Sequence, residues 1–222
     1  LGWSLDDSTE IFTRQEMIDA FTMQRVNKAP ASFDPGKLKA FQDKWFQTLD
    51  EKKKVALCVP YLQESGLVTT PPDCSLAPRL TAILAAAGDR IKIAGDILRF
   101  ADFFVPDDKL EYETKPFSKR IGDADAVERL GRVRDRFAKL ESFDAQSCEA
   151  AIRDFVETEG IKMGQIIHAI RVAVTGKAVG AGMFETLAIL GRESTLCRID
   201  RARRQATDQI HGGEGAGEVE GD

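Results

Sequence analysis

The stretch that decides the fold spans residues 161–191 and reads IKMGQIIHAIRVAVTGKAVGAGMFETLAILG. Its apolar residues mostly recur three or four positions apart on both sides of a glycine-rich centre, which is the spacing of one face of an α-helix. Gly176 follows the last apolar turn of the first half, where a helix C-terminus favours glycine. The pattern therefore predicts two helices, joined at residues 180–182 by a segment with almost no side chains.

Arg171 is the one charged residue inside the first of these two helices, and it allows two interpretations. Apolar stripes at helical spacing are usually core, so Arg171 could simply lie at the solvent edge of a helical hairpin. Alternatively, a bare backbone joint beside a planar guanidinium would let a flat, polar ligand approach closely.

The composition indicates a globular, helical protein. The chain has 222 residues, of which 43% are hydrophobic and 30% charged, enough for one large or two small domains with cores. No β-alternation of useful length occurs, so we expect an all-α fold. No apolar run reaches about 18 residues, so we expect no membrane contact. Because the chain begins at Leu1, with a start that reads as neither a signal peptide nor a natural N-terminus, we expect a fragment of a longer protein. Its four scattered cysteines are typical of reduced thiols, so we expect a cytoplasmic protein.

The net charge of −5 comes from the end of the chain. Residues 205–222 carry five acidic residues and no Lys or Arg, and the other 31 acidic residues balance the 31 basic ones. A neutral body can still present local basic faces to a phosphate backbone. The Gly/Glu-rich composition of 205–222 predicts a disordered tail.

No set of catalytic or metal-binding residues is present. The chain has no P-loop, GxSxG, HExxH or dinucleotide-binding motif. The four cysteines form no CxxC pair, and there are only two histidines, so we expect free thiols and no metal site. His168 lies between apolar residues of a helix, where a structural role is the expected one.

Helix signals also define the rest of the chain. Thr13 and Glu16 fit a capping box, and Asp34 followed by proline predicts a second helix start. Further helices are expected over 51–66, 76–84, 91–104, 124–140, 146–159 and 193–204, and a loop is expected over 112–119.

At this point two segments resemble a known family. LGWS…EIFT…RVNKAPASFDPGKLKAF near the start, and IKMGQIIHAIRVAVTGK…GMFETLAILGRESTLCRID near the end, resemble the C-terminal half of bacterial-type glutamyl-tRNA synthetases. The resemblance runs from Leu1 to about Arg204 and is looser, in pattern only, over 50–140. It implies the end of a stem-contact domain at 1–36 and two helical anticodon-binding subdomains at 37–140 and 141–204.

The resemblance also implies what this chain lacks. The catalytic domain of the family lies before this region, and its HIGH-like motif and lysine signature loop do not occur here. ATP and Mg²⁺ are implied only for that missing domain, so we expect no cofactor in this chain and no activation of glutamate by it alone. The implied partner is glutamate tRNA, bound by a monomer.

The resemblance assigns anticodon contacts to specific positions. Arg90, in DRIKIA, corresponds by its spacing to Asp96 to the arginine that contacts the third anticodon base, although Ile93-Ala94 replaces the Thr-Leu pair of the family. Arg171 corresponds to an arginine at the anticodon loop. The joint of the family, often TPGLF, reads GAGMF here, so the contacts fall on Gly180, Ala181 and Met183 without the usual threonine and proline.

The residues themselves leave a second function open. The arginines could pair with surface carboxylates instead of binding bases, and the chain would then be a helical protein–protein interaction or regulatory module.

Overall fold

The computed structural model describes residues 2–6, 8–28 and 32–214, and the all-α class predicted from the sequence is confirmed for them. The helices of the chain, in order, are α1 (Arg14–Ala20), η1 (Met23–Arg25), α2 (Pro35–Thr48), α3 (Glu51–Glu64), α4 (Leu76–Ala87), η2 (Gly88–Arg90), η3 (Ala94–Phe103), η4 (Asp107–Lys109), α5 (Thr114–Ile121), α6 (Ala124–Ala138), α7 (Ala145–Glu159), α8 (Met163–Thr175) and α9 (Met183–Glu214), where η marks a 3₁₀-helix. Within the described part, β-pairing is limited to an isolated antiparallel bridge between Trp3 and Val26.

The chain divides into two compact units, Leu1–Leu49 and Asp50–Asp222. These units are defined by packing alone. The boundaries predicted after residues 36, 140 and 204, between the stem-contact part, the two anticodon-binding subdomains and the tail, stay predictions. The first unit begins with a loop closed by the Trp3–Val26 bridge. Its α1 starts at the predicted capping box, in which Thr13 and Glu16 each accept from the backbone amide of the other. Its α2 starts at Asp34, whose carboxylate accepts from two amides of the first turn.

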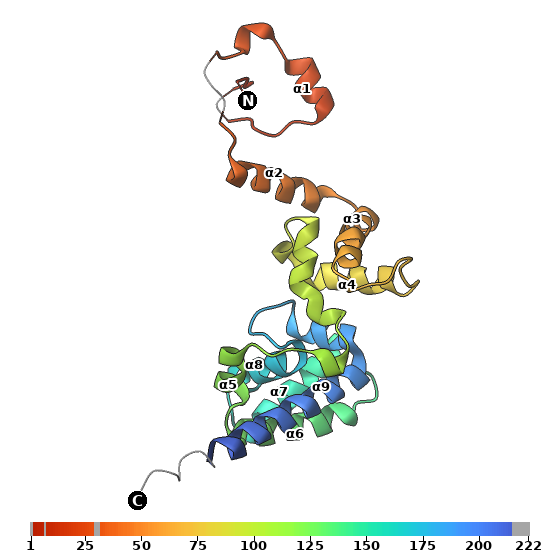
Figure 1. Cartoon of the computed structure of the whole chain (residues 1–222), viewed down its shortest axis with the longest axis vertical. Helices are drawn as coiled ribbons and strands as arrows, with labels where there is room; N and C mark the ends of the chain where they lie inside the picture. The colour runs from red at the N-terminus through yellow and green to blue at the C-terminus, as the bar shows by residue number, and fades with distance from the viewer. Residues whose placement is uncertain (1, 7, 29–31, 215–222) are drawn as a thin grey trace, which may run out of the picture. The chain divides into compact units, whose positions relative to one another are not determined.

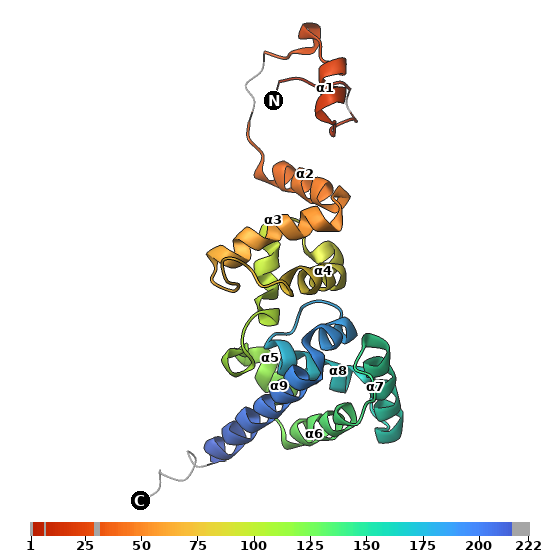
Figure 2. The same ribbon diagram turned by 90° about the vertical axis from the view of Figure 1, so that its right-hand side faces the viewer.

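The core of the second unit lies between α5, α6, α7, α8 and α9 (Figure 1). The two predicted helices of 161–191 form its centre, since Val172 and Val174 of α8 and Leu187 of α9 are fully buried. Figure 2 shows the same helices turned by 90°. α9 packs along α6, and α7 lies at the right-hand side of the group. α3, α4 and η3 pack together as the remaining part of this unit.

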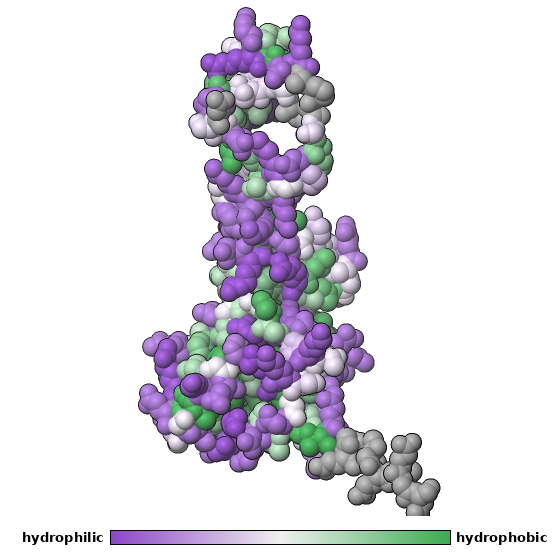
Figure 3. Space-filling model, turned by 90° about the vertical axis from the view of Figure 1, so that its left-hand side faces the viewer, coloured by the Kyte–Doolittle hydropathy of each residue, from purple (hydrophilic) through white to green (hydrophobic). Residues whose placement is uncertain are grey.

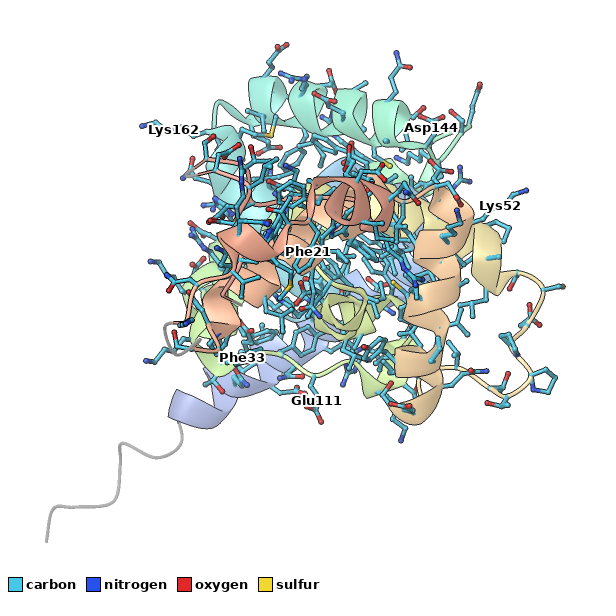
Figure 4. The ribbon with its side chains drawn as sticks, turned by 90° about the horizontal axis from the view of Figure 1, so that it is seen from above. Phe21, Phe33, Lys52, Glu111, Asp144 and Lys162 are labelled. Carbon is cyan, nitrogen blue, oxygen red and sulfur yellow. The ribbon has the colours of Figure 1, made fainter. Side chains whose placement is uncertain are left out.

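Helix ends follow the sequence signals in most places. Asp144 caps α7, and Gly160 ends it in a left-handed conformation with φ of 63°. Seen from above, α7 spans the distance between the labelled Asp144 and Lys162 (Figure 4). α9 is broken at Gly191, where φ is 78°, so the second helix of 161–191 and the helix expected over 193–204 form one element with a kink between them.

Three segments differ from the prediction. The loop expected at 112–119 gives way at Thr114 to α5, which runs to Ile121. Pro116 is compatible with this helix because it occupies the first turn, where its missing N–H costs no helical hydrogen bond. The expected helix at 91–104 is a 3₁₀-helix, interrupted at Phe100. The last helix continues past Arg204 to Glu214, because Ala206 is buried and adds to the core. The rest of the predicted tail, 215–222, lies outside the described residues.

None of the described helices combines the length and apolar character that a membrane crossing requires. On the face shown in Figure 3, hydrophilic residues cover most of the surface, and hydrophobic ones gather in small separate patches. Scattered apolar patches are ordinary for protein surfaces.

Candidate functional site

The joint between α8 and α9 begins where two backbone segments approach closely. Gly176 ends α8 with φ of 76°, and a Cβ placed on it would lie 1.9 Å from the carbonyl oxygen of Glu111. The amide of Glu113 donates to the Gly176 carbonyl at 2.8 Å. Only glycine fits here, both for its φ and for the space, so this position fixes where the joint leaves the core.

The far end of the joint is attached to α4. The amide of Gly182 donates to the carbonyl of Ala86 at 3.1 Å, one residue before α4 ends at Ala87. Gly88 has φ of 56° and starts η2, which carries Arg90. This single backbone hydrogen bond therefore brings the predicted joint beside the end of α4 and the residues that follow it.

The two predicted arginines lie where the α8–α9 joint meets the end of α4 and η2, a region called the junction below. Arg171 on α8 is half-buried, and its Nη1 donates to the carbonyl of Ala181 at 2.8 Å. Arg90 is exposed, and its Nη1 donates to the carbonyl of Ala87 at 3.3 Å. Burial lowers the pKa of Arg171, and the positive charge of Arg90 lowers it further, while Asp102 opposes the shift. Arginine remains charged at neutral pH, so the junction holds two neighbouring positive charges.

The other predicted site residues differ in their accessibility. Gly180 is partly exposed, whereas Ala181 and Met183 are only 3% and 6% exposed. Met183 packs in the hydrophobic core, so its side chain stabilises the start of α9. The exposed part of the joint is formed by its neighbours, including Val179, which is 71% exposed. The surface that a ligand could reach is therefore the turn before Ala181, with the two arginines at its side.

Lys177 and Asp102 belong to the same junction, although the sequence pattern did not single them out. Lys177 follows Gly176, and its ammonium forms an ion pair with Asp102 of η3 and donates to the carbonyl of Arg99. The Asp102 side chain is 6% exposed. The only sequence signal was a lysine directly after a helix-ending glycine, which does not by itself predict a partner some 75 positions away.

Arg198 on α9 is a third residue that the sequence pattern did not single out. It is 1% exposed, and its Nε lies 2.6 Å from Oδ1 of Asp107. Its other nitrogens donate to the carbonyls of Asp102, Val105 and Val174 at 2.8–3.0 Å. The signal was available, because Arg198 is spaced three from Thr195 and four from Ala202, both of which face the core.

The junction offers binding groups and no catalytic set. Its charged groups are guanidinium and ammonium cations, the buried carboxylate of Asp102 and the exposed carboxylate of Glu185, which lies against Gly182. Its exposed backbone carries little side-chain bulk. Among the residues that the structure describes, no cluster of His, Cys, Asp and Glu could hold a metal ion. His168 is exposed on α8, and burial together with the nearby Arg120 and Arg171 lowers its pKa. Such an arrangement suits a planar polar or anionic ligand.

The chain is similar to proteins of known family. The profile of a family described as anticodon binding domain matches residues 53–203. The glutamate–tRNA ligase of Herpetosiphon aurantiacus is 34% identical over 203 residues, which cover 91% of this chain and 41% of that ligase. The glutamate–tRNA ligase of Moorella thermoacetica is 34% identical over 210 residues, with 95% and 43% covered. The chain thus spans about two fifths of the length of these curated relatives.

Solved structures show the same fold. The crystal structure of a glutamate tRNA ligase from Elizabethkingia meningosepticum superposes with a TM-score of 0.80 at 22% identity, over 93% of this chain and 39% of that one. Glutamate-tRNA synthetase from Elizabethkingia anophelis gives a TM-score of 0.77 at 23% identity, over 92% and 38%.

Proposed function

Because this chain belongs to the anticodon-binding domain family, we propose that it binds glutamate tRNA and recognises its anticodon as the tRNA-binding part of a glutamate–tRNA ligase. The observation that carries the proposal is the meeting of Arg90 and Arg171 at the α8–α9 joint. Arg90 comes from η2, directly after α4, and Arg171 comes from α8. The Gly182–Ala86 hydrogen bond joins the α8–α9 joint to the end of α4.

The chemistry of the junction suits unstacked RNA bases. A guanidinium offers a planar fork of donors that matches the acceptor edge of a base, and the bare joint permits close approach. Single-stranded loops, in which bases are splayed out, are the usual targets of sequence-specific RNA recognition. Lys and Arg side chains elsewhere on the surface would bind phosphates and so orient the tRNA without reading its sequence. Arg90, Arg171 and the backbone near Gly180 would supply the discrimination.

A binding measurement tests this proposal. The dissociation constant is measured for glutamate tRNA and for the same tRNA with its third anticodon base replaced, at fixed low salt. We expect tighter binding of the unaltered tRNA, and we expect Arg90→Ala to reduce that preference more than it reduces overall affinity. Arg153→Ala on α7, which removes a charge from an exposed ion pair with Glu149, is the control. Weak and equal binding of both tRNAs by the wild-type chain would refute the proposal.

The remaining expectations about the whole protein belong to the same proposal. The chain acts in the cytoplasm as a monomer, and ATP, Mg²⁺ and glutamate bind to a catalytic part that relatives carry outside the matched region. An aminoacylation assay with this chain alone should give no product. Size-exclusion chromatography with light scattering should give the mass of one chain, 24.5 kDa.

A second candidate function, protein–protein interaction, is favoured by the first unit. Large apolar side chains there are exposed between 42% and 73%, namely Met17, Ile18, Phe21, Met23, Val26, Phe33, Leu38 and Trp45. Exposed apolar side chains mark a protein contact where they form a contiguous surface. If this is the main function, a protein partner captured by the chain stays bound after nuclease treatment, and the chain shows no preference among tRNAs.

A further inference from the structure

Lys177 is turned away from solvent at the start of the α8–α9 joint. Its side chain is 21% exposed, and its ammonium is shared between the Asp102 carboxylate and the Arg99 carbonyl of η3. The ammonium also lies 5.6 Å from the centre of the Phe100 ring, within the range of a cation–π contact. Three groups of one 3₁₀-helix therefore hold this single lysine.

The stem of Lys177 lies next to the joint and to Arg171. A Cβ built on Gly180 would be 3.9 Å from Cε of Lys177 and 3.5 Å from Nη1 of Arg171. The Thr175 hydroxyl donates to the Arg171 carbonyl at 2.8 Å and lies 3.3 Å from the Lys177 carbonyl. Lys177, the turn at Gly180 and Arg171 are thus in mutual contact, so that moving one of them would displace the other two.

Asp102 is in turn fixed to α9. Its backbone carbonyl accepts from Nη1 of Arg198 at 2.9 Å, and Arg198 is 1% exposed. The carboxylate that holds Lys177 therefore sits on a rigid part of the core. A rigid second layer of contacts is what a binding site needs to keep its contact groups in one geometry.

We propose that the Lys177–Asp102 ion pair is a positioning pair that determines anticodon specificity, because it holds the α8–α9 joint and Arg171 in the geometry that reads a base. This inference rests on the proposed function. Lys177 does not bind tRNA phosphate itself, since its ammonium already has two acceptors and is mostly buried. Removing the pair lets the joint move, so base discrimination is lost while phosphate contacts remain.

The experiment compares Lys177→Met, Asp102→Asn and the double variant with wild type. Dissociation constants are measured for glutamate tRNA and for the tRNA with its third anticodon base replaced, across a series of salt concentrations. Each single variant is expected to reduce the preference for the unaltered tRNA about tenfold, which corresponds to about 1.4 kcal/mol. The double variant should lose no more than either single one, because the two residues act together. Lys177→Arg keeps the charge and should retain the preference.

A second measurement follows the joint without tRNA. Hydrogen exchange at the Gly182 amide, which donates to Ala86, should be faster in Lys177→Met and Asp102→Asn than in wild type. Arg153→Met is the matched control, because it removes a cation from an exposed pair on α7, and it should change neither the exchange rate nor the preference. Melting followed by circular dichroism identifies a variant that does not fold, and the other single variant then carries the comparison, because either substitution removes the ion pair.

The outcomes separate this inference from the proposed function. A wild-type chain that binds both tRNAs equally refutes the proposed function and the inference with it. A wild-type chain that discriminates, together with single variants that discriminate equally well, refutes the inference alone. Lys177→Met could instead weaken the affinity for both tRNAs by the same factor and reduce the slope of log affinity against log salt concentration by about one. Lys177 would then be a phosphate contact, and the positioning role would be wrong.

Discussion

Nη1 of Arg171 lies 2.8 Å from the carbonyl oxygen of Ala181, so the arginine proposed to read a base also supports the backbone of the joint beside it. A guanidinium has five N–H donors, and this hydrogen bond uses one of them. The other donors can reach a ligand while the first keeps the plane of the guanidinium oriented. Orientation and recognition are therefore combined in one side chain.

Arg171→Lys should separate these two roles. Lysine keeps the positive charge but replaces the planar fork with a point charge, so it cannot both bind Ala181 and form a bidentate contact. We expect the preference for the unaltered anticodon to fall about tenfold, since a bidentate contact contributes roughly 1–3 kcal/mol of discrimination. Overall tRNA affinity at low salt should change much less. Equal discrimination by Arg171→Lys and wild type in a binding titration would show that Arg171 acts only through its charge.

Arg198 should be the arginine on which folding depends most. It is buried, and its removal leaves the Asp107 carboxylate and three backbone carbonyls without their donor. Arg198→Met should lower the free energy of unfolding by about 3–5 kcal/mol, as expected when one partner of a buried pair is removed. Urea unfolding measures this. Arg204→Met, at an exposed position of the same helix, is the control and should change stability little. Similar losses in both variants would contradict the structural role of Arg198.

The four cysteines should fall into two classes of reactivity. Cys58 and Cys148 are fully buried, and burial raises their pKa to about 11 and about 12. Because the thiolate is the reactive form, both should resist an aromatic disulfide reagent at pH 8 in the folded state. The exposed Cys74 and Cys197 should react quickly. The double variant Cys74→Ser, Cys197→Ser should lose the fast phase, and urea should expose the slow pair.

The sequence was sufficient for the helices whose signals are local. Capping at Thr13 and Asp34, the glycine stop at Gly176, and the apolar spacing of 161–191 all predicted real features, because each depends on residues within a few positions. The helix α5 was missed, since a loop was expected over 112–119; its Pro116 lies in the first turn, where a helix tolerates proline.

The candidate site was predictable only in part. Arg171 and the bare joint were visible as a pattern, and the resemblance added Arg90. The ion pair between Lys177 and Asp102 was not visible, because a contact across 75 positions depends on how η3 packs against the joint. Met183 was assigned to the anticodon contact by its place in the motif, and that role stays a prediction. Its apolar side chain is buried in the core, where packing stabilises the fold.

Two glycines with similar backbone conformation should respond differently to the same substitution. Gly160 and Gly176 both end helices with positive φ, at 63° and 76°. A Cβ on Gly160 would meet nothing within 4 Å, whereas one on Gly176 would lie 1.9 Å from the Glu111 carbonyl oxygen. Gly160→Ala should therefore cost only the left-handed conformation, about 1–2 kcal/mol. Gly176→Ala adds the displacement of a backbone segment, so we expect a total of about 2–5 kcal/mol, given that overpacking alone costs about 1–3 kcal/mol.

Urea unfolding of the two alanine variants checks this difference, and tRNA binding extends it. Gly160 lies between α7 and α8, away from the joint in sequence, so Gly160→Ala should keep the anticodon preference of the wild type. Gly176→Ala should reduce that preference even under conditions in which the variant is fully folded. The reason is that the clash with residue 111 shifts the point at which the joint leaves the core. Equal unfolding free energies for the two variants would mean that the 111–113 segment yields without cost, and that Gly176 serves only its left-handed φ.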